Sequence, residues 1–394
     1  MTFDLRWTSL IAAATLVAAA STATLTADVA GAAARTPAAK PVYGIGFEGP
    51  LSGANAQFGI NEVNAVRLAI TQANARGTLP FTLTLVQEDD EGDPAHSPAA
   101  AEALVTDPRV RAVVGPSFSG STQATGDLYA QAGLGTVSPS ASNPLLSGEG
   151  WRTFHRVIAT DRLEPQLTAA WLHRRHVHEL AVVWDRSSYG ATTAAAITRR
   201  ARALHLTVRR YTVPSSGRYG SIATSIAAHE PGAVYFAGYD TDAVKLARSL
   251  KARHYRGVKV GGNGMLDTLF TARSRSAGYG WYATCGCMTS YRTTAQKAFA
   301  AAYRNEFNEF PGLYSAQAYD ATNTIIRAIS AAVAGGNSSR YWVNRALGQV
   351  QFTGISTRIR FTSHGDLSST VARVNLFRDR RGRFAEVGSI RAAS

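Results

Sequence analysis

Short apolar strands alternate with helical segments along most of this 394-residue sequence, and the alternation starts twice. The first series runs from Val42 to about residue 157, and a second begins near residue 158. Parallel strands joined by helices form sheets that are covered on both faces. Because one modest sheet would not hold this many strands, the pattern predicts an α/β fold with two doubly wound parallel-sheet lobes.

The expected elements follow the spacing of apolar residues. Strands are expected over residues 42–47, 81–86, 112–114, 135–137, 180–184, 206–213, 233–237, 258–260, 356–361 and 370–377. Helices are expected over residues 60–76, 98–105, 123–131, 163–173, 191–204, 219–228, 243–253, 293–307 and 315–334.

The N-terminus has the pattern of a secretory signal. Arg6 precedes an apolar run from Leu10 to Ala20, and a tract of small residues ends in Ala-x-Ala cleavage options at 32–34. We therefore expect residues 1–34 to be a signal peptide and residues 35–41 to be a flexible leader. Because no cysteine lies near the cleavage options, we expect a secreted or cell-envelope protein that is not lipid-anchored.

The formal net charge of +14 at pH 7 comes from basic clusters spread along the chain. The arginines within 199–202, 209–210 and 378–383 have no interleaved aromatic residues and no nucleic-acid motif beside them. We interpret them as solvated faces that favour an anionic setting such as a cell envelope, and we expect no nucleic-acid partner.

The chain has two cysteines, Cys285 and Cys287, separated by one glycine. An oxidising compartment favours a disulfide between them, although a separation of two residues is strained. Two thiols alone make a poor zinc site. His173, His176 and the acidic run at 88–93 fit helix ends better than metal ligands. We expect no metal and no cofactor.

A strand, a serine-rich turn and a helix start follow one another between Arg111 and Gln123. Residues 112–114 end a buried strand, and residues 117–122 form a loop of small, mostly hydroxyl-bearing residues. Free backbone N–H groups at a helix start, together with the positive end of the helix dipole, favour an anion. Serine and threonine also begin helices without any ligand, so an ordinary N-cap is the alternative.

Motifs for catalysis or nucleotide binding are weak in this sequence. The glycines at 44, 46 and 49 match a dinucleotide fingerprint, but they begin inside a strand and lead into Pro50 instead of a helix. The Gly-x-Ser-x-Gly elbow and the Gly-x-x-x-x-Gly-Lys loop are absent. We therefore expect a binding protein and not an enzyme.

In open α/β sheets, ligands bind beyond the carboxyl ends of the strands. Those ends carry the loops 117–121 and 138–142 in the first lobe, and 186–189, 238–240 and 261–264 in the second. Two lobes that present such loops to one another would form a cleft that closes on a small molecule by hinge motion.

Five motifs occur in order along the chain: Phe-Glu-Gly-Pro-Leu-Ser-Gly-Ala-Asn-Ala-Gln-Phe-Gly at 47–59, Val-Gly-Pro-Ser-Phe-Ser-Gly-Ser-Thr-Gln at 114–123, Ser-Pro-Ser-Ala-Ser-Asn-Pro at 138–144, Asp-Arg-Ser-Ser-Tyr-Gly at 185–190 and Ala-Tyr-Asp-Ala at 318–321. Together they resemble the type I periplasmic-binding-protein family, specifically the leucine/isoleucine/valine-binding receptors of ABC importers. The resemblance covers about residue 42 to the C-terminus. It implies two lobes joined by hinge crossovers: residues 42–157 plus 283–370 in the N-terminal lobe, and residues 158–282 plus 371–394 in the C-terminal lobe.

The resemblance also implies a ligand site. The α-carboxylate of the ligand is expected at Ser119, at the backbone of Ala141 and at Ser142, which agrees with the anion site inferred above. The ligand's side chain is expected among three aromatic residues on strand-end loops: Phe58, Tyr189 and Tyr239.

In this family the acidic partner of the ligand ammonium lies in a Gly-x-Glu/Asp-Gly setting, and the matching residue here is Asn263. A neutral amide accepts a hydrogen bond but supplies no charge, and charge-assisted bonds are roughly twice as strong. Either Asp240 or Asp267 takes over this role, or the ligand is not an ordinary α-amino acid. The family's first-lobe disulfide is also missing, because its two positions match Gly92 and Phe118.

We therefore expect an extracellular solute-binding protein of an ABC importer. It would act as a monomer, bind a branched-chain or related amino acid and meet a membrane permease. The alternative is an extracellular sensing lobe for a small amide or organic acid that partners a separate membrane receptor.

Overall fold

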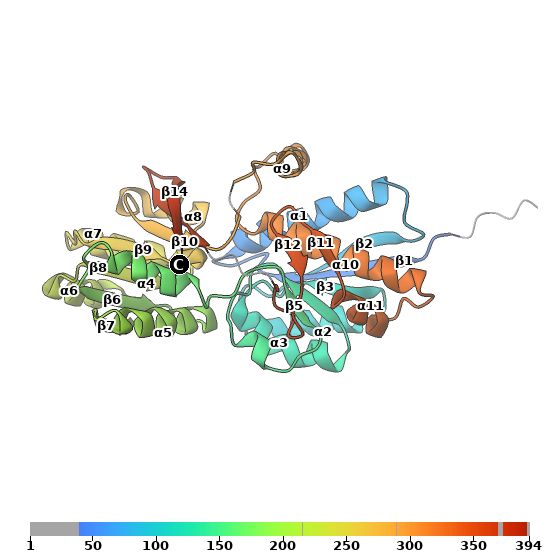
Figure 1. Cartoon of the computed structure of the whole chain (residues 1–394), viewed down its shortest axis with the longest axis horizontal. Coiled ribbons are helices and arrows are strands. Elements are labelled where there is room, and N and C mark those ends of the chain that lie inside the picture. The colour runs from blue at the N-terminus through green and yellow to red at the C-terminus, as the bar shows by residue number, and fades with distance from the viewer. Residues whose placement is uncertain (1–38, 215, 289, 369–372, 392–394) are drawn as a thin grey trace, which may run out of the picture. The chain divides into compact units, whose positions relative to one another are not determined.

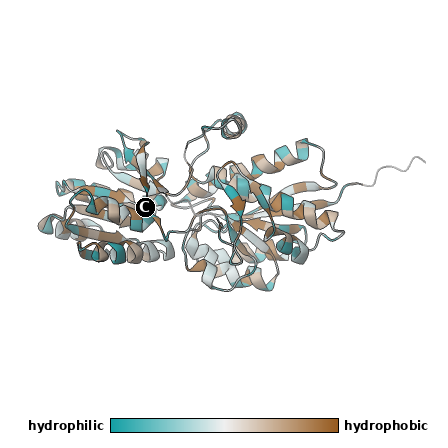
Figure 2. Ribbon diagram, in the orientation of Figure 1, coloured by the Kyte–Doolittle hydropathy of each residue, from teal (hydrophilic) through white to brown (hydrophobic). Residues whose placement is uncertain are grey.

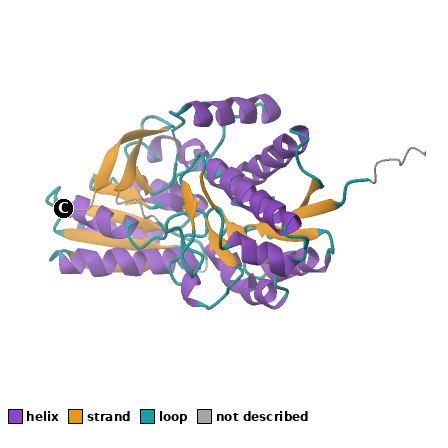
Figure 3. Cartoon of the chain, turned by 45° about the vertical axis from the view of Figure 1, so that its right-hand side comes forward, coloured by secondary structure: helices purple, strands orange, loops and turns teal. Residues whose placement is uncertain are grey.

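The computed structural model describes residues 39–214, 216–288, 290–368 and 373–391 (Figure 1). The predicted signal peptide and most of the predicted leader lie outside these residues. The described strands form a five-stranded sheet, a seven-stranded sheet and a two-stranded ribbon. Figure 3 shows helices packed along the strands of both large sheets. No described helix combines the length and the apolar character needed to cross a membrane.

The first lobe is built on a five-stranded sheet in which all neighbours are parallel. Its strands are β1 (Val42–Gly49), β2 (Thr82–Asp89), β3 (Val110–Val114), β4 (Gly135–Ser138) and β5 (Phe154–Arg156). Its helices are α1 (Ala56–Ala75), α2 (Ser97–Thr106), α3 (Ser119–Gln131), α9 (Thr294–Phe307), α10 (Ser315–Ala334) and α11 (Arg340–Leu347). The ribbon of β11 (Gln351–Thr353) and β12 (Arg358–Arg360) follows α11, and a short 3-10 turn, η1 (Leu146–Gly148), follows β4.

The second lobe is built on the seven-stranded sheet. Five strands are parallel: β6 (Glu179–Trp184), β7 (Thr207–Thr212), β8 (Ala233–Ala237), β9 (Val258–Gly261) and β10 (Tyr282–Cys285). Two are antiparallel and are the last described strands: β13 (Arg373–Asp379) and β14 (Phe384–Arg391). The helices are α4 (Glu164–His173), α5 (Ser188–Ala203), α6 (Gly220–His229), α7 (Asp240–Ala252) and α8 (Thr268–Ser274), with 3-10 turns η2 (Asn263–Met265) and η3 (Arg275–Ala277).

The two sheets share one strand order. The first runs β2-β1-β3-β4-β5, and the parallel part of the second runs β7-β6-β8-β9-β10. The order reverses between β1 and β3 and again between β6 and β8, and such switch points are where open α/β sheets bind ligands. The prediction of two doubly wound lobes is confirmed, with an antiparallel pair added to the second sheet.

The expected crossing between lobes after residue 282 is wrong, because it falls inside β10. Tyr282 and Ala283 pair with β9, and Cys285 pairs with β13, so the chain leaves the second sheet only after Cys285. Short elements with little apolar periodicity were also not expected: β5, β10, α8, α11, β11 and β14.

Several helices begin earlier than their apolar periodicity indicates. α3 begins at Ser119 instead of residue 123, α5 at Ser188 instead of 191, and α7 at Asp240 instead of 243. Their first turns contain small or polar residues that carry no apolar signal, yet the backbone is already helical; the N–H of Thr122 donates to Phe118 O (2.9 Å). The loops that carry candidate ligand residues are therefore partly helix N-terminal turns.

Each lobe buries its strands between helices. Figure 2 shows hydrophobic and hydrophilic residues alternating along the helices that cover the sheets. One apolar cluster belongs to the first lobe around β1, α1 and α10. A second cluster belongs to the second lobe but also includes first-lobe residues, among them Phe58, Phe118 and Tyr314. The two lobes thus share apolar packing near the switch points.

Candidate functional site

Polar contacts join the two lobes at the carboxyl ends of their strands. Asn143 Nδ2 of the first lobe donates to Ser188 Oγ at the start of α5 (2.9 Å). Thr241 Oγ1 of α7 donates to the Ala54 carbonyl oxygen before α1 (3.2 Å). The loops at both switch points therefore meet, and the structure is a closed form of the two lobes.

The residues predicted for a ligand carboxylate lie together, but their polar groups are already engaged. Ser119 Oγ accepts from the Asn143 N–H (3.3 Å), and Ser142 Oγ donates to Asp161 Oδ2 (2.6 Å). The N–H of Ala141 donates to Ser138 Oγ (3.0 Å). The turn after β4 thus uses the Ala141 N–H internally in this form of the protein.

A buried arginine holds this turn in place. Arg156 is 0% exposed, and its Nη1 donates to the carbonyl oxygens of Ala141 (2.8 Å) and Asn143 (2.7 Å). Its Nε donates to Asp366 Oδ1 (2.6 Å), and Nη2 donates to Ser147 Oγ (2.5 Å). Because every contact goes to the protein itself, Arg156 shapes the first-lobe wall of the site.

Five aromatic side chains from both lobes form one group, here called the aromatic cluster. Phe118 stacks on Tyr239 with ring centroids 4.4 Å apart, and Tyr189 lies 5.3 Å from Tyr239. Phe58 lies 5.6 Å from Phe118 and 6.2 Å from both Tyr239 and Tyr314. The structure therefore brings together the three predicted residues Phe58, Tyr189 and Tyr239, and adds Phe118 and Tyr314.

Phe118 also explains why one glycine is needed nearby. Gly92 has a φ of +70°, and a Cβ at this position would lie 2.8 Å from a ring carbon of Phe118. The two positions that the family resemblance pairs are thus neighbours in the structure, where a ring packs against a bare backbone.

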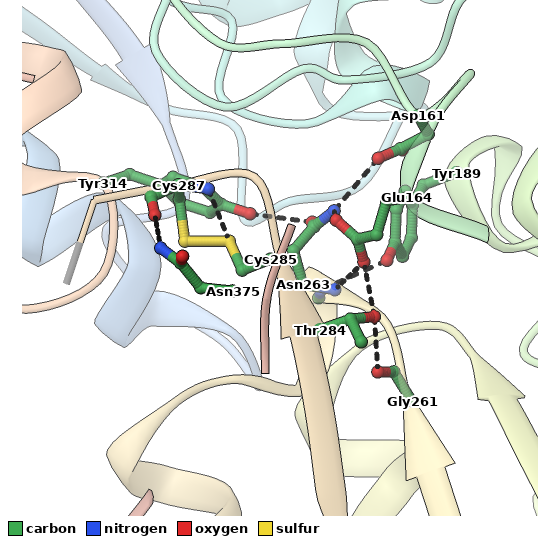
Figure 4. Close-up of a disulfide and its surroundings, with 11 residues drawn as sticks. Asp161, Glu164, Tyr189, Gly261, Asn263, Thr284, Cys285, Cys287, Tyr314 and Asn375 are labelled. Carbon is green, nitrogen blue, oxygen red and sulfur yellow. Dashed lines mark hydrogen bonds between the residues drawn. A yellow bond between two sulfur atoms is a disulfide. The ribbon is translucent and has the colours of Figure 1, made fainter. Parts of the chain in front are cut away.

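Asn263 lies at the centre of a buried polar network (Figure 4). Its Nδ2 donates to Asp161 Oδ1 and to Glu164 Oε2, both at 3.0 Å. Its backbone N–H donates to Glu164 Oε1 (2.9 Å), and its Oδ1 accepts from Tyr314 Oη (2.8 Å). Thr284 Oγ1 also donates to Glu164 Oε1 (3.1 Å). Asn263 therefore holds two carboxyl groups.

The sequence did not single out Asp161 and Glu164. Asp161 lies in the crossover after β5, and Glu164 is the first residue of α4. An acid at a helix start ordinarily reflects the helix dipole, so position alone gave no functional signal. The one available signal was a polar run, Thr-Asp-Arg-Leu-Glu-Pro, between a buried strand and a helix.

Asp240 and Asp267, the predicted substitutes for a missing acid, have their contacts elsewhere. Asp240 Oδ1 accepts from the Thr241 N–H (2.7 Å), and Asp267 Oδ1 accepts from the Leu269 N–H as the N-cap of α8 (2.8 Å). Burial raises the pKa of Asp240 to about 7, with the nearby Asp267 adding to the effect. The polar contacts of Asp240 and Asp267 lie at the starts of α7 and α8, and not with Asn263.

Burial sets the protonation of the carboxyls in the network. Together with the nearby Asp161, it raises the pKa of Glu164 to about 8. It raises the pKa of Asp161 to about 6, against hydrogen bonds from Ser142 and Asn263. Burial likewise raises the pKa of Glu62 on α1 to about 8. Ser117 Oγ, in the loop after β3, donates to Glu62 Oε2 (2.5 Å).

Folding stability should fall as the pH rises from 6.5 to 8. In this window the folded protein keeps protons on Glu62 and Glu164 that the unfolded chain, with ordinary pKa values, has already released. Because the folded state binds more protons than the unfolded state, raising the pH from 6.5 to 8 lowers the free energy of unfolding by about 1–2 kcal/mol for each glutamate. His155, whose pKa burial lowers to about 4, acts in the opposite direction but below pH 6.5.

Urea denaturation at pH 6.5 and pH 8 measures this difference. Glu62→Gln should flatten the dependence, because the glutamine does not titrate. Equal stability of the unmodified protein at both pH values would show that these carboxyls are ionised in the folded state.

A disulfide lies beside the network. Cys285, the last residue of β10, is joined to Cys287 in the crossover that follows, and both are buried (Figure 4). The Cys287 N–H donates to Cys285 Sγ (3.1 Å), and Asn375 Nδ2 of β13 donates to the Cys287 carbonyl oxygen (3.4 Å). The bond therefore lies where the chain passes from the second lobe to the first.

Two hollows differ in their relation to this site. A cavity of about 20 Å³, room for about one water molecule, is lined by Asp161, Glu164, Asn263 and Cys285 among others. A groove of about 1050 Å³ lies on the first lobe, and its lining residues include none of the predicted site residues. Among the described residues, no group of three or more His, Cys, Asp or Glu side chains is placed to hold a metal ion.

Two doubly wound lobes with facing switch points, joined by crossovers and closed around aromatic and polar side chains, define a two-lobed binding protein. The chain belongs to the periplasmic binding protein family, whose model matches residues 42–379. The family consists of substrate-binding proteins and not enzymes.

Two relatives show the extent of the similarity. The Leu/Ile/Val-binding protein BraC3 of Rhizobium johnstonii is 30% identical over 261 residues, which cover 65% of this chain and 71% of the relative. The leucine-, isoleucine-, valine-, threonine- and alanine-binding protein of Pseudomonas aeruginosa is 26% identical over 345 residues, 86% of this chain and 91% of the relative.

Solved structures share the fold at lower identity. A leucine binding protein, LivK, from Thermotoga maritima is 19% identical with a TM-score of 0.80, covering 89% of this chain and 99% of that one. A solute binding protein of an ABC transporter from R. palustris, in complex with benzoate, is 18% identical with a TM-score of 0.79, covering 90% and 97%. These likenesses establish the type I fold.

Proposed function

We propose that this protein is the exported solute-binding component of an ABC importer and that it binds a branched-chain or related amino acid between its lobes. The observation that carries the proposal is the meeting of the two switch points, where aromatic and polar side chains of both lobes form one contact network. Both relatives are named as proteins that bind leucine, isoleucine and valine, which supports this ligand class.

The aromatic cluster gives a place for an apolar ligand side chain. Phe58 and Phe118 come from the first lobe, and Tyr189 and Tyr239 come from the second. When the lobes open, the stacking of Phe118 on Tyr239 is lost and both ring faces are exposed. A ligand side chain that packs against these rings adds its own apolar burial on closure, which favours the closed form of the liganded protein.

The serine segment at the start of α3 gives a place for the ligand carboxylate. The first N–H groups of this helix have no partner within the helix, and the dipole favours a negative group there. Ser119 and Ser142 lie at this end, each within hydrogen-bonding distance of one protein group in the closed form. We propose that both hydroxyls turn to the carboxylate when a ligand is bound.

The remaining parts of the proposal rest on the N-terminal sequence and on the family. The signal peptide over residues 1–34 would export the chain, without a lipid anchor, and the closed, liganded monomer would deliver its ligand to a membrane permease. The protein carries out no reaction on the ligand, because binding and release complete its task.

A thermal-shift screen tests the ligand class. L-leucine, L-isoleucine and L-valine should raise the melting temperature in a concentration-dependent way, since a ligand that binds only the folded state adds about 4 kcal/mol at a thousand times its Kd. D-leucine serves as the matched control, and benzoate tests the class of ligand held by the R. palustris structure. No shift with any L-amino acid, or a shift with benzoate alone, would exclude an amino-acid receptor.

A further inference from the structure

Two buried carboxyl groups, Asp161 and Glu164, meet where the lobes join, and neither forms a salt bridge with another described residue. Asp161 and Glu164 both accept from Asn263 Nδ2 at 3.0 Å, and the two acids are 3% and 4% exposed. Burial keeps a proton on Glu164 near neutral pH, and a cationic group brought beside the two carboxyls would favour their ionised forms.

The contacts of Asn263 show what it contributes. Nδ2 is shared between two carboxyl groups, Oδ1 accepts from Tyr314, and the backbone N–H donates to Glu164. Its polar atoms therefore hold protein groups in place, and a cationic ligand group would find negative oxygens only on Asp161 and Glu164. Asn263 acts as a positioning residue.

A second, independent feature marks the same place. The hydroxyl of Tyr235 on β8 is fully buried and has no hydrogen-bond partner among the described residues. A Cβ at Gly262 would lie 3.0 Å from Tyr235 Oη, 3.1 Å from Glu164 Oε1 and 2.5 Å from Tyr189 Oη. Three oxygens thus converge over a residue without a side chain, and one of them lacks its partner.

The place is also contiguous with the proposed ligand contacts. Tyr189 and Tyr314 belong to the aromatic cluster, and they reach the network through Gly264 N–H to Tyr189 Oη (3.2 Å) and Tyr314 Oη to Asn263 Oδ1 (2.8 Å). Ser142, proposed for the ligand carboxylate, donates to Asp161. An amino acid with its carboxylate near Ser142 would have its ammonium within reach of these acids.

We propose that Glu164, together with Asp161, is the counter-ion for the ligand's α-ammonium, and that Asn263 positions the two carboxyl groups. This inference rests on the proposed function, since it assumes an amino-acid ligand. The acids that select for the ligand's amine would then be Glu164, at the start of α4, and Asp161, in the crossover before α4.

Ligand binding should then release a proton. The groups that face the pair from the surrounding elements are Arg156 of β5 and the phenols of Tyr189, Tyr235, Tyr239 and Tyr314, whose pKa values burial raises well above 10. The carboxyls are therefore the groups that titrate near neutral pH, with pKa values raised to about 6 and 8. An incoming ammonium favours the ionised pair, so the proton on Glu164 leaves to solvent.

Calorimetry of L-leucine binding at pH 7.5, in two buffers that differ in ionisation enthalpy, measures this proton. The unmodified protein should release up to one proton per leucine, and 4-methylpentanoate, which lacks the amine, should bind more weakly and release none. Glu164→Gln should weaken leucine binding by about 10- to 100-fold and abolish proton release, because a charge-assisted hydrogen bond is lost. This variant should bind 4-methylpentanoate as the unmodified protein does.

Two further variants complete the test. Glu164→Gln combined with Asn263→Asp returns a carboxyl to the same place by two isosteric changes, and it should recover part of the affinity for leucine. Asp240→Asn, another buried acid with a raised pKa, should change leucine affinity by less than about twofold. Melting temperatures of all variants show whether each one folds.

The outcomes separate this inference from the proposed function. If the unmodified protein binds leucine but Glu164→Gln binds it equally well, or if Asp240→Asn removes the proton release, the inference is overturned and the amino-acid receptor stands. If Glu164→Gln does not fold, equal affinity and equal proton release for leucine and 4-methylpentanoate in the unmodified protein overturn it. If the unmodified protein binds no L-amino acid, the proposed function is overturned and the inference with it.

Discussion

Replacing Arg156 with leucine should lower the free energy of unfolding by about 3–5 kcal/mol, because it leaves the half-buried Asp366 and two buried carbonyl oxygens without their cation. The guanidinium is 0% exposed and contacts Asp366, Ser147 and two carbonyl oxygens of the turn after β4. That turn carries Ser142, so the variant should also bind leucine poorly at temperatures where it is still folded. Urea denaturation measures the first effect, and calorimetry measures the second.

The matched control is Arg152→Leu, which changes an exposed arginine four residues earlier on the same segment. A surface change of this kind should alter stability by less than about 0.5 kcal/mol. Equal stability of the two variants would contradict the assignment of Arg156 as the group that organises the first-lobe wall.

Removing the ring of Tyr239 should have the largest effect on ligand affinity. Tyr239 contacts rings of both lobes, with centroids 4.4 Å away at Phe118 and 5.3 Å away at Tyr189. A central aromatic at an interface is worth about 2–3 kcal/mol, so Tyr239→Ala should weaken leucine binding by about 30- to 150-fold. Calorimetry with the purified, folded variant measures this change.

Tyr279→Ala is the control, since Tyr279 belongs to the same lobe and is 45% exposed. It should leave the affinity for leucine unchanged. If Tyr239→Ala folds and binds leucine as tightly as the unmodified protein, the aromatic cluster packs the lobes together without contacting a ligand.

Much of the fold could be predicted from apolar periodicity. The buried parallel strands β6 and β8 are continuous apolar runs, and long helices such as α10 have a clear apolar face. Helix starts such as Ser119 could not be placed, because small hydroxyl residues carry no apolar signal. The strand β10 was missed because it has only four residues, and its partners are β9 and, about ninety residues later, β13.

Some residues of the candidate site could also be predicted from the sequence, and others could not. Phe58, Tyr189 and Tyr239 were expected from the family resemblance, and the structure joins them in one cluster. Asp161 and Glu164 were not, because their importance depends on meeting Asn263, about one hundred residues further along the chain. A sequence shows that an acid begins a helix, but not which buried amide faces it.

Hydrogen–deuterium exchange with and without saturating L-leucine tests most directly whether an amino acid is held between the lobes. We expect leucine to slow exchange in segments of both lobes at once, at residues 119–122 and 142–143 of the first and at residues 188–190, 239–241 and 262–264 of the second. Slowed exchange confined to one lobe, or to the first-lobe groove around Trp151 and Arg360, would contradict binding between the lobes.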